Sequence, residues 1–215
     1  MTTFPLLRVA ALVFAAVTFV VIGDTAGKLL TGGGVDPFFV AWSRFAIAAV
    51  LLLPVSGVRV RDLPKLLHGR VFARACIIAA AICCILTALK TEPIANVFGA
   101  FFVGPIVSYG LAIAFLGERP SRLRSALLAV GFLGVLLVVK PGFGGSTGMV
   151  FALMAGTLYG GYLAATRATA GHYRPRFLLL SQLLIGSVVL MPFGLSVDLL
   201  PPELPGGHNR TVPCY

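Results

Sequence analysis

The stretch PFFVAWSRFAIAAVLLLP, residues 37–54, returns later in the chain as PRFLLLSQLLIGSVVLMP, residues 175–192. Each copy is an apolar segment long enough to cross a bilayer, and prolines bound it at both ends. Two copies in one chain predict an internal duplication, whereas chance resemblance between two Leu-rich helices is the alternative. Aligned without a gap, the copies share Pro37/Pro175, Phe39/Phe177, Ser43/Ser181, Ile47/Ile185, Val50/Val188, Leu52/Leu190 and Pro54/Pro192.

Composition indicates that lipid is the solvent of this chain. Of the 215 residues, 58% are hydrophobic and 11% are charged, whereas soluble domains carry about 25% charged residues. Several apolar runs exceed about 18 residues, the length at which a membrane helix is expected. No alternating pattern typical of barrel strands is present, so the sequence predicts an all-α integral membrane protein, a helical bundle.

Apolar runs and turn residues divide the chain into seven expected membrane helices. The first run is too long for a signal-peptide core, so it is interpreted as a retained helix. After residue 200 the chain is rich in proline, glycine and polar residues, which predicts a disordered tail at residues 201–215. The expected helices cover residues 9–30, 37–55, 71–89, 94–116, 125–139, 148–166 and 177–195.

The distribution of the net charge of +10 predicts the orientation. Loops at residues 59–70, 117–124 and 167–176 hold most of the basic residues, so they and the N-terminus are expected in the cytoplasm. The charge therefore indicates cytoplasmic loops and not a nucleic-acid partner. Asp36 precedes the first copy and Arg174 the second. This change of sign is what two copies crossing in opposite directions require.

Several short motifs resemble those of a known family. They are Thr91-Glu92-Pro93, Pro105, Gly117-Glu118-Arg119 and Val138-Val139-Lys140-Pro141. Together with the apolar pattern they closely resemble an EamA domain of the drug/metabolite transporter superfamily. The resemblance implies ten helices in two inverted five-helix repeats around a central cavity. Residues 1–142 would form the first repeat, and residues 143–200 only the first two helices of a second, partial repeat.

The resemblance implies a multi-pass transporter of small organic metabolites or drugs that works by alternating access. The expected location is the bacterial inner membrane, and the expected partners are the lipid bilayer and a small-molecule substrate. We expect no enzymatic activity, no cofactor and no metal, because no metal-ligand spacing is present and the three cysteines at positions 76, 83 and 84 lie in one apolar run. Two alternatives stay open: a truncated fragment without transport activity, and a seven-helix receptor-like protein.

Two ionisable residues at membrane depth are the first candidates for a substrate cavity. Arg44 lies seven residues into its helix, about 10 Å deep at 1.5 Å per residue. Asp24 reaches a similar depth from the end of the preceding helix, so the two are expected to pair. Such a pair can be a gate, a substrate contact or a structural contact. Lys28, one turn from Asp24, is a competing partner.

Further cavity candidates are the polar residues on the helices expected to line a cavity, Asn96, Tyr109, Tyr159, Tyr162 and Gln182. Gln182 occupies the position of Arg44 in the second copy. Each tyrosine has an interfacial or packing role as its alternative.

Other residues are expected to shape the helices. Pro105 is expected to kink the helix at 94–116, and Arg74 is expected to snorkel toward the membrane surface. The GxxxG pairs at residues 23–27 and 156–160 predict close helix packing, with a homodimer interface as the second reading.

The orientation can be tested with a reporter that is active only outside the cytoplasm. Fused at Gly206 it is expected to be active, and fused at His68 or His172 it is expected to be silent. Activity at His68 would reverse the predicted orientation of the whole chain.

Overall fold

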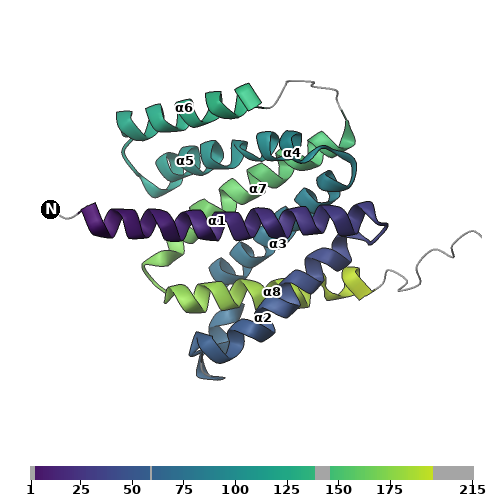
Figure 1. Cartoon of the computed structure of the whole chain (residues 1–215). Coiled ribbons are helices and arrows are strands. Elements are labelled where there is room, and N and C mark those ends of the chain that lie inside the picture. Colours follow the sequence, from purple (N-terminus) through teal and green to yellow (C-terminus); the bar gives the residue numbers. More distant parts are fainter. Residues whose placement is uncertain (1–2, 59, 139–145, 196–215) are drawn as a thin grey trace, which may run out of the picture.

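A computed structural model describes residues 3–58, 60–138 and 146–195. These residues form a bundle of α-helices with one short 3₁₀ helix and no strand (Figure 1). The expected tail at residues 201–215 and most of the linker after residue 139 lie outside the described residues. The elements are α1 (Thr3–Gly32), α2 (Pro37–Ser56), η1 (Val60–Leu67), α3 (Gly69–Thr91), α4 (Ile94–Phe101), α5 (Val103–Leu116), α6 (Arg122–Val138), α7 (Thr147–Ala170) and α8 (Pro175–Leu195).

Local sequence explains where α2 begins and ends. The Asp36 carboxylate accepts hydrogen bonds from the backbone N–H groups of Phe38, at 2.7 Å, and Phe39, at 3.4 Å. Pro37 follows at the first helical position, where its missing N–H leaves no bond unmade. The helix ends at Gly57, whose φ of 62° lies in the left-handed region that favours glycine.

The helix expected over residues 94–116 is divided into α4 and α5 at Phe102. Pro105 lies three residues further on and has no N–H to donate to the carbonyl of Phe101, its helical partner four residues earlier. The interruption therefore lies on the N-terminal side of the proline, where a proline kink is expected.

Two details differ from the sequence-based expectation. The basic loop after α2 contains η1, a 3₁₀ helix with Pro64 inside it. Helix α7 continues to Ala170, so Arg167 belongs to its last turn and not to a loop. A cation there interacts favourably with the negative end of the helix dipole.

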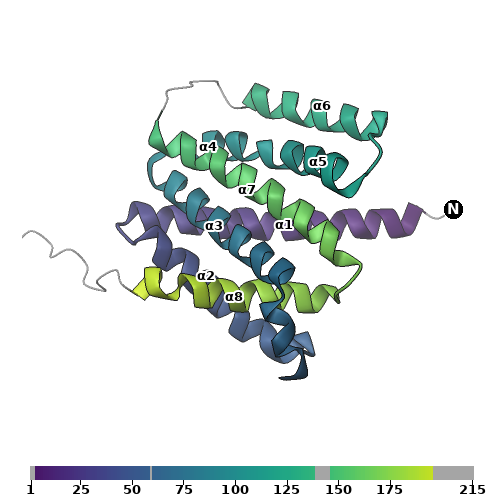
Figure 2. The same ribbon diagram turned by 180° about the vertical axis from the view of Figure 1, so that it is seen from behind.

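Helix α3 lies at the centre of the bundle. It crosses behind α1 in Figure 1 and beside α7 and α8 in Figure 2, and it also contacts α2. In the most apolar stretch of α3, 56% of the residues are buried, whereas in that of α1 only 6% are buried. Leu86 and Leu89 of α3 belong to the main core cluster, together with Val40 and Phe45 of α2. The core is thus built around α3, and α1 covers one side.

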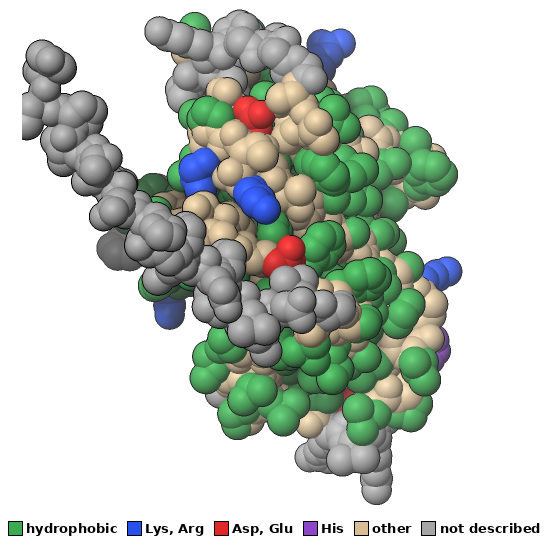
Figure 3. All heavy atoms as spheres, turned by 90° about the vertical axis from the view of Figure 1, so that its right-hand side faces the viewer, with side chains coloured by type: hydrophobic (Ala, Val, Ile, Leu, Met, Phe, Trp, Pro, Cys, Tyr) green, Lys and Arg blue, Asp and Glu red, His purple; other side chains and the backbone are tan. Residues whose placement is uncertain are grey.

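Six helices of the described residues are long and apolar enough to cross a membrane. They are α1, α2, α3, α7, α8 and the α4–α5 pair taken together. The described part of α6 has 17 residues, about 26 Å at 1.5 Å per residue. Figure 3 looks at one end of the bundle, where hydrophobic side chains form the flanks around a few acidic and basic ones. The protein is therefore an integral membrane bundle.

The two copies of the repeated stretch, α2 and α8, pack against each other. Gly186 of α8 lies against the ring of Phe45, and Gly194 lies against Trp42. The shared serines make the same local bond, Ser43 to the carbonyl of Val40 at 3.0 Å and Ser181 to that of Leu178 at 2.9 Å. This similarity agrees with a duplication, which stays a prediction.

Glycines let α7 approach the broken helix α4–α5 closely. A Cβ atom on Gly156 would lie 2.8 Å from the carbonyl oxygen of Phe101, and one on Gly160 would lie 2.6 Å from that of Gly104. The GxxxG face of α7 is therefore occupied within the chain, as the packing interpretation expects. This face offers no support for the homodimer.

The tight contact predicts different effects for two neighbouring substitutions. Gly160→Ala is expected to lower the free energy of unfolding by about 1–3 kcal/mol, because the added methyl meets rigid backbone. Gly161→Ala is the matched control: nothing lies within 4 Å of its Cβ position, so the variant is expected to be neutral or slightly more stable. Thermal unfolding of the detergent-solubilised protein measures both. Equal midpoints for the two variants would contradict the packing described here.

Candidate functional site

A cavity of about 430 Å³ lies between α1, α2, α3, α4, α7 and α8. Small-molecule sites typically measure about 300–1,000 Å³ and combine apolar walls with a few polar groups. Five of the seven cavity candidates from the sequence line it. Its walls are Val20 and Asp24 of α1, Arg44, Phe45 and Ala48 of α2, Ile78, Ala81, Ile82 and Ile85 of α3, Phe98 and Phe101 of α4, Tyr159 and Tyr162 of α7, and Gln182 and Leu183 of α8.

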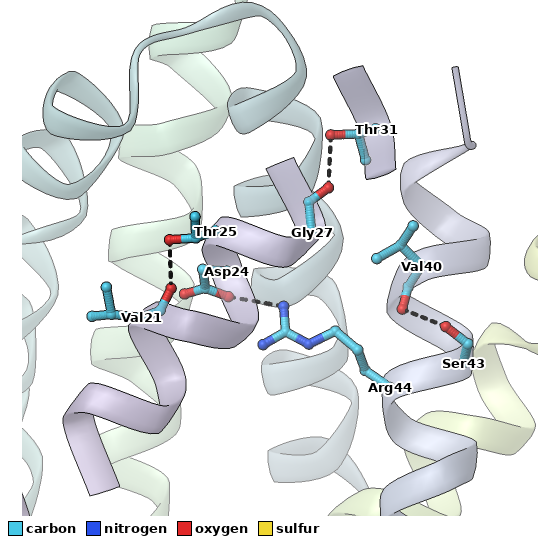
Figure 4. A network of polar contacts seen from close by, with 8 residues as sticks. All are labelled: Val21, Asp24, Thr25, Gly27, Thr31, Val40, Ser43 and Arg44. Atoms are coloured by element: carbon cyan, nitrogen blue, oxygen red, sulfur yellow. Dashed lines mark hydrogen bonds and ion pairs between the residues drawn. The ribbon is translucent and has the colours of Figure 1, made fainter. Parts of the chain in front are cut away.

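Asp24 and Arg44 form the ion pair that residue counting predicts. The Nη1 atom of Arg44 donates to Oδ1 of Asp24 at 2.8 Å, and Figure 4 shows the guanidinium reaching from α2 to the carboxylate on α1. The Asp24 side chain is 5% exposed and the Arg44 side chain 31% exposed. Arg44 is therefore the more accessible member of the pair.

The glycines of α1 make room for this contact. A Cβ atom on Gly23 would lie 3.2 Å from Nη2 of Arg44, and one on Gly27 would meet Leu86 at 2.7 Å. Lys28, the competing partner, points elsewhere: its ammonium donates to the backbone carbonyls of Leu89, at 3.1 Å, and Glu92 at the end of α3. Asp24 is thus left to Arg44.

Arg74 corrects a sequence-based expectation. It does not snorkel, because its side chain is buried inside the bundle and the residue is 1% exposed. Its Nη1 donates to the hydroxyls of Tyr162, at 3.3 Å, and Thr166, at 3.1 Å, and its Nη2 donates to the carbonyl of Leu178. No carboxylate of the described residues lies within 4.0 Å of it. Arg74 therefore joins α3, α7 and α8 without a counter-charge.

Tyr162 connects this buried cation to the cavity. Its hydroxyl accepts from Arg74 and donates to Oε1 of Gln182 at 2.7 Å. Tyr159 stacks beside it with ring centroids 5.9 Å apart, and Phe101 packs on Tyr159 at 4.9 Å. The aromatic wall of the cavity thus includes a hydrogen-bonded polar pair, Tyr162 and Gln182.

The other two cavity candidates lie outside this cavity. The hydroxyl of Tyr109 lies 2.9 Å from that of Ser125 and accepts from the backbone N–H of Ser121 at 3.1 Å, so Tyr109 joins α5 to the start of α6. Asn96 lies in the first turn of α4 and is not among the residues that line the cavity. Helix membership alone did not reveal which way these side chains turn.

The sequence also missed Arg74 as a member of the site. The available signal was a charge five residues into a helix, close enough to the surface for snorkelling and therefore ambiguous. Among the described residues, no three His, Cys, Asp or Glu side chains are grouped so as to hold a metal ion. Cys76, Cys83 and Cys84 line a separate, apolar pocket.

With the cavity described, its relatives can be compared. Residues 7–140 match the EamA-like transporter family. The chain belongs to this family. An uncharacterized transporter of Archaeoglobus fulgidus is 25% identical over 164 residues, which cover 74% of the EamA-like chain and 57% of that relative. The chain thus spans little more than half the length of this relative. No solved structure matches it.

The family match covers only part of the cavity. Asp24 and Arg44 lie inside the matched residues 7–140, whereas Tyr159, Tyr162 and Gln182 lie beyond them. The matched residues therefore contribute the walls from α1 to α4. The walls from α7 and α8 are formed by residues outside the match.

The ion pair predicts a non-additive response to substitution. Asp24→Asn and Arg44→Gln are each expected to lower the thermal stability of the detergent-solubilised protein, because each leaves the other charge uncompensated in a low dielectric. The double variant is expected to recover part of the loss. Unfolding midpoints of the four proteins form a double-mutant cycle.

Lys28→Gln serves as the control for this cycle, because Lys28 does not contact Asp24 in the structure. It is expected to leave the coupling between Asp24 and Arg44 unchanged. Strictly additive losses would rule out an energetically coupled pair.

Proposed function

We propose that this chain binds a small organic molecule in the cavity between α1, α2, α3, α4, α7 and α8 and takes part in its transport across a membrane. The cavity carries the proposal: it lies inside a membrane bundle, has largely apolar walls, and holds a charged pair and three further polar side chains. Ionisable groups at membrane depth typically mark a substrate or ion pathway. Membership of the EamA-like transporter family supports the same reading.

Alternating access is the mechanism we propose for the movement. The cavity is lined by α2 and α8, the two copies of the repeated stretch, and in repeat-built transporters the substrate site lies at the repeat interface. The break between α4 and α5 at Phe102 gives one wall a point at which it can bend. Rocking of one set of helices against the other would then open the cavity to each side in turn.

The proposal treats the chain as a carrier and not as an enzyme. Asp24 is the one carboxylate among the described residues that line the cavity, and it is held by Arg44. General acid–base chemistry needs a positioned group that is free to exchange its proton. Recognition of a solute needs only shape, apolar surface and hydrogen-bond partners, which this cavity has.

Filling the cavity tests the proposal. Ala48→Phe places a ring where Ala48 lines the cavity. Because the ring fills space that the solute would occupy, the variant is expected to reduce saturable transport at least about tenfold. The measurement is solute counterflow in liposomes containing the full chain, with a library of labelled amines, carboxylates and neutral metabolites.

Val50→Phe is the matched control, because Val50 lies two residues further along the same helix and is exposed toward the bundle exterior. It is expected to transport like the wild type. Unchanged transport by Ala48→Phe, or no counterflow of any library member by the wild type, would contradict the proposed function.

A further inference from the structure

We propose that the molecule recognised by this cavity is an organic anion, with a carboxylate as its head group and a small apolar body. The inference rests on the proposed function and names the substrate class of the same site. It follows from three features of the described residues: the sum of the buried charges, the direction of a hydrogen-bond chain, and the nature of the remaining walls.

The buried charges around the cavity do not cancel. Asp24 and Arg44 neutralise each other through the 2.8 Å contact. Arg74 adds a second guanidinium, which stays protonated in proteins and has no carboxylate within 4.0 Å among the described residues. Its Nε atom is buried and has no hydrogen-bond partner. The buried charges around the cavity therefore sum to one positive charge among the described residues, and an unpaired buried charge is costly.

A chain of hydrogen bonds links the positive charge of Arg74 to the cavity wall. Arg74 donates to the hydroxyl of Tyr162, so the tyrosine proton is free to be donated onward to Oε1 of Gln182 at 2.7 Å. The amide nitrogen of Gln182 is then the end of the chain, and its two N–H groups are left as donors at a cavity wall. Each donor in such a chain strengthens the next, so the cavity meets the positive end of the chain.

Arg44 provides donors from another wall. Asp24 occupies its Nη1 atom, and the other guanidinium N–H groups make no hydrogen bond within the described residues. Arg44 and Gln182 occupy equivalent positions in the two copies of the repeated stretch, and both line the cavity. A carboxylate held between them would accept charge-assisted hydrogen bonds from both sides.

The rest of the cavity selects the body of the ligand. Phe45, Phe98 and Phe101 and the isoleucines of α3 present apolar surface. Burial of an apolar body against this surface stabilises the complex through the hydrophobic effect. An inorganic anion would leave this surface unused, and a cation would meet the guanidinium group of Arg44.

Head-group series test the proposal with the full chain in phosphatidylcholine nanodiscs. The probes are phenylacetate, 3-phenylpropionate and 4-phenylbutyrate, each with its neutral amide and its cationic amine. We expect the best carboxylate to bind at least about tenfold more tightly than its amide and its amine, in line with hydrogen bonds to a charged group. Affinity is measured by ligand-dependent thermal shift.

Two variants connect the preference to the hydrogen-bond chain. Tyr162→Phe and Gln182→Leu are expected to bring the carboxylate-to-amide ratio close to one, while Ser187→Ala is expected to keep it. Ser187 is a fair control because its hydroxyl donates to the carbonyl of Leu184 within α8, and it is not among the residues that line the cavity. The unfolding midpoint without ligand confirms that each variant is folded.

The outcomes separate this inference from the proposed function. Equal or tighter binding of an amide or amine overturns the anion inference and leaves the cavity as a ligand site. A carboxylate preference that survives in both chain variants overturns it too, because the anion then binds elsewhere on a basic protein. If no probe binds, the anion inference falls, and counterflow with the wider library still decides the proposed function. A head-group preference without counterflow contradicts transport alone.

Discussion

The cost of removing a guanidinium group from water is the constraint on which this bundle depends. A charge at membrane depth needs a partner or a polar cavity, since lipid offers neither. Arg44 meets this need with Asp24 and so joins α1 to α2. Arg74 meets it with hydroxyls of α7 and a carbonyl of α8 and so joins both helices to α3. These contacts involve most of the helices that surround the cavity.

Close helix approach decides which side chains these cations can reach. Gly156 and Gly160 bring the backbone of α7 against the broken helix α4–α5. That contact fixes the rotation of α7 and directs Tyr159 and Tyr162 into the cavity. In lipid, where apolar surface alone does not drive helices together, such van der Waals contact is a main source of association. Packing and polar recognition are therefore properties of the same helix faces.

The repeated stretch acquires a meaning in the structure that its residues alone do not have. Arg44 and Gln182 differ chemically, so the alignment suggests a role that was not duplicated. In the structure both positions line one cavity. The two positions that the alignment pairs thus lie at one site, where one is a cation and the other an amide. A site with a cation on one wall and an amide on another can recognise an asymmetric molecule.

The sequence alone was sufficient for the helices of this protein, their approximate ends, the interruption before Pro105 and the pairing of Asp24 with Arg44. These depend on local effects: apolar length against bilayer thickness, caps and prolines, and the depth of a charge counted along one hairpin. Only the tertiary structure decided that Arg74 is buried, that Tyr109 belongs to the α5–α6 junction, and that Tyr162 links Arg74 to Gln182. Those outcomes depend on the rotation of each helix about its axis. That rotation is set by contacts between residues far apart in the chain, such as Gly160 with Gly104, which no local pattern encodes.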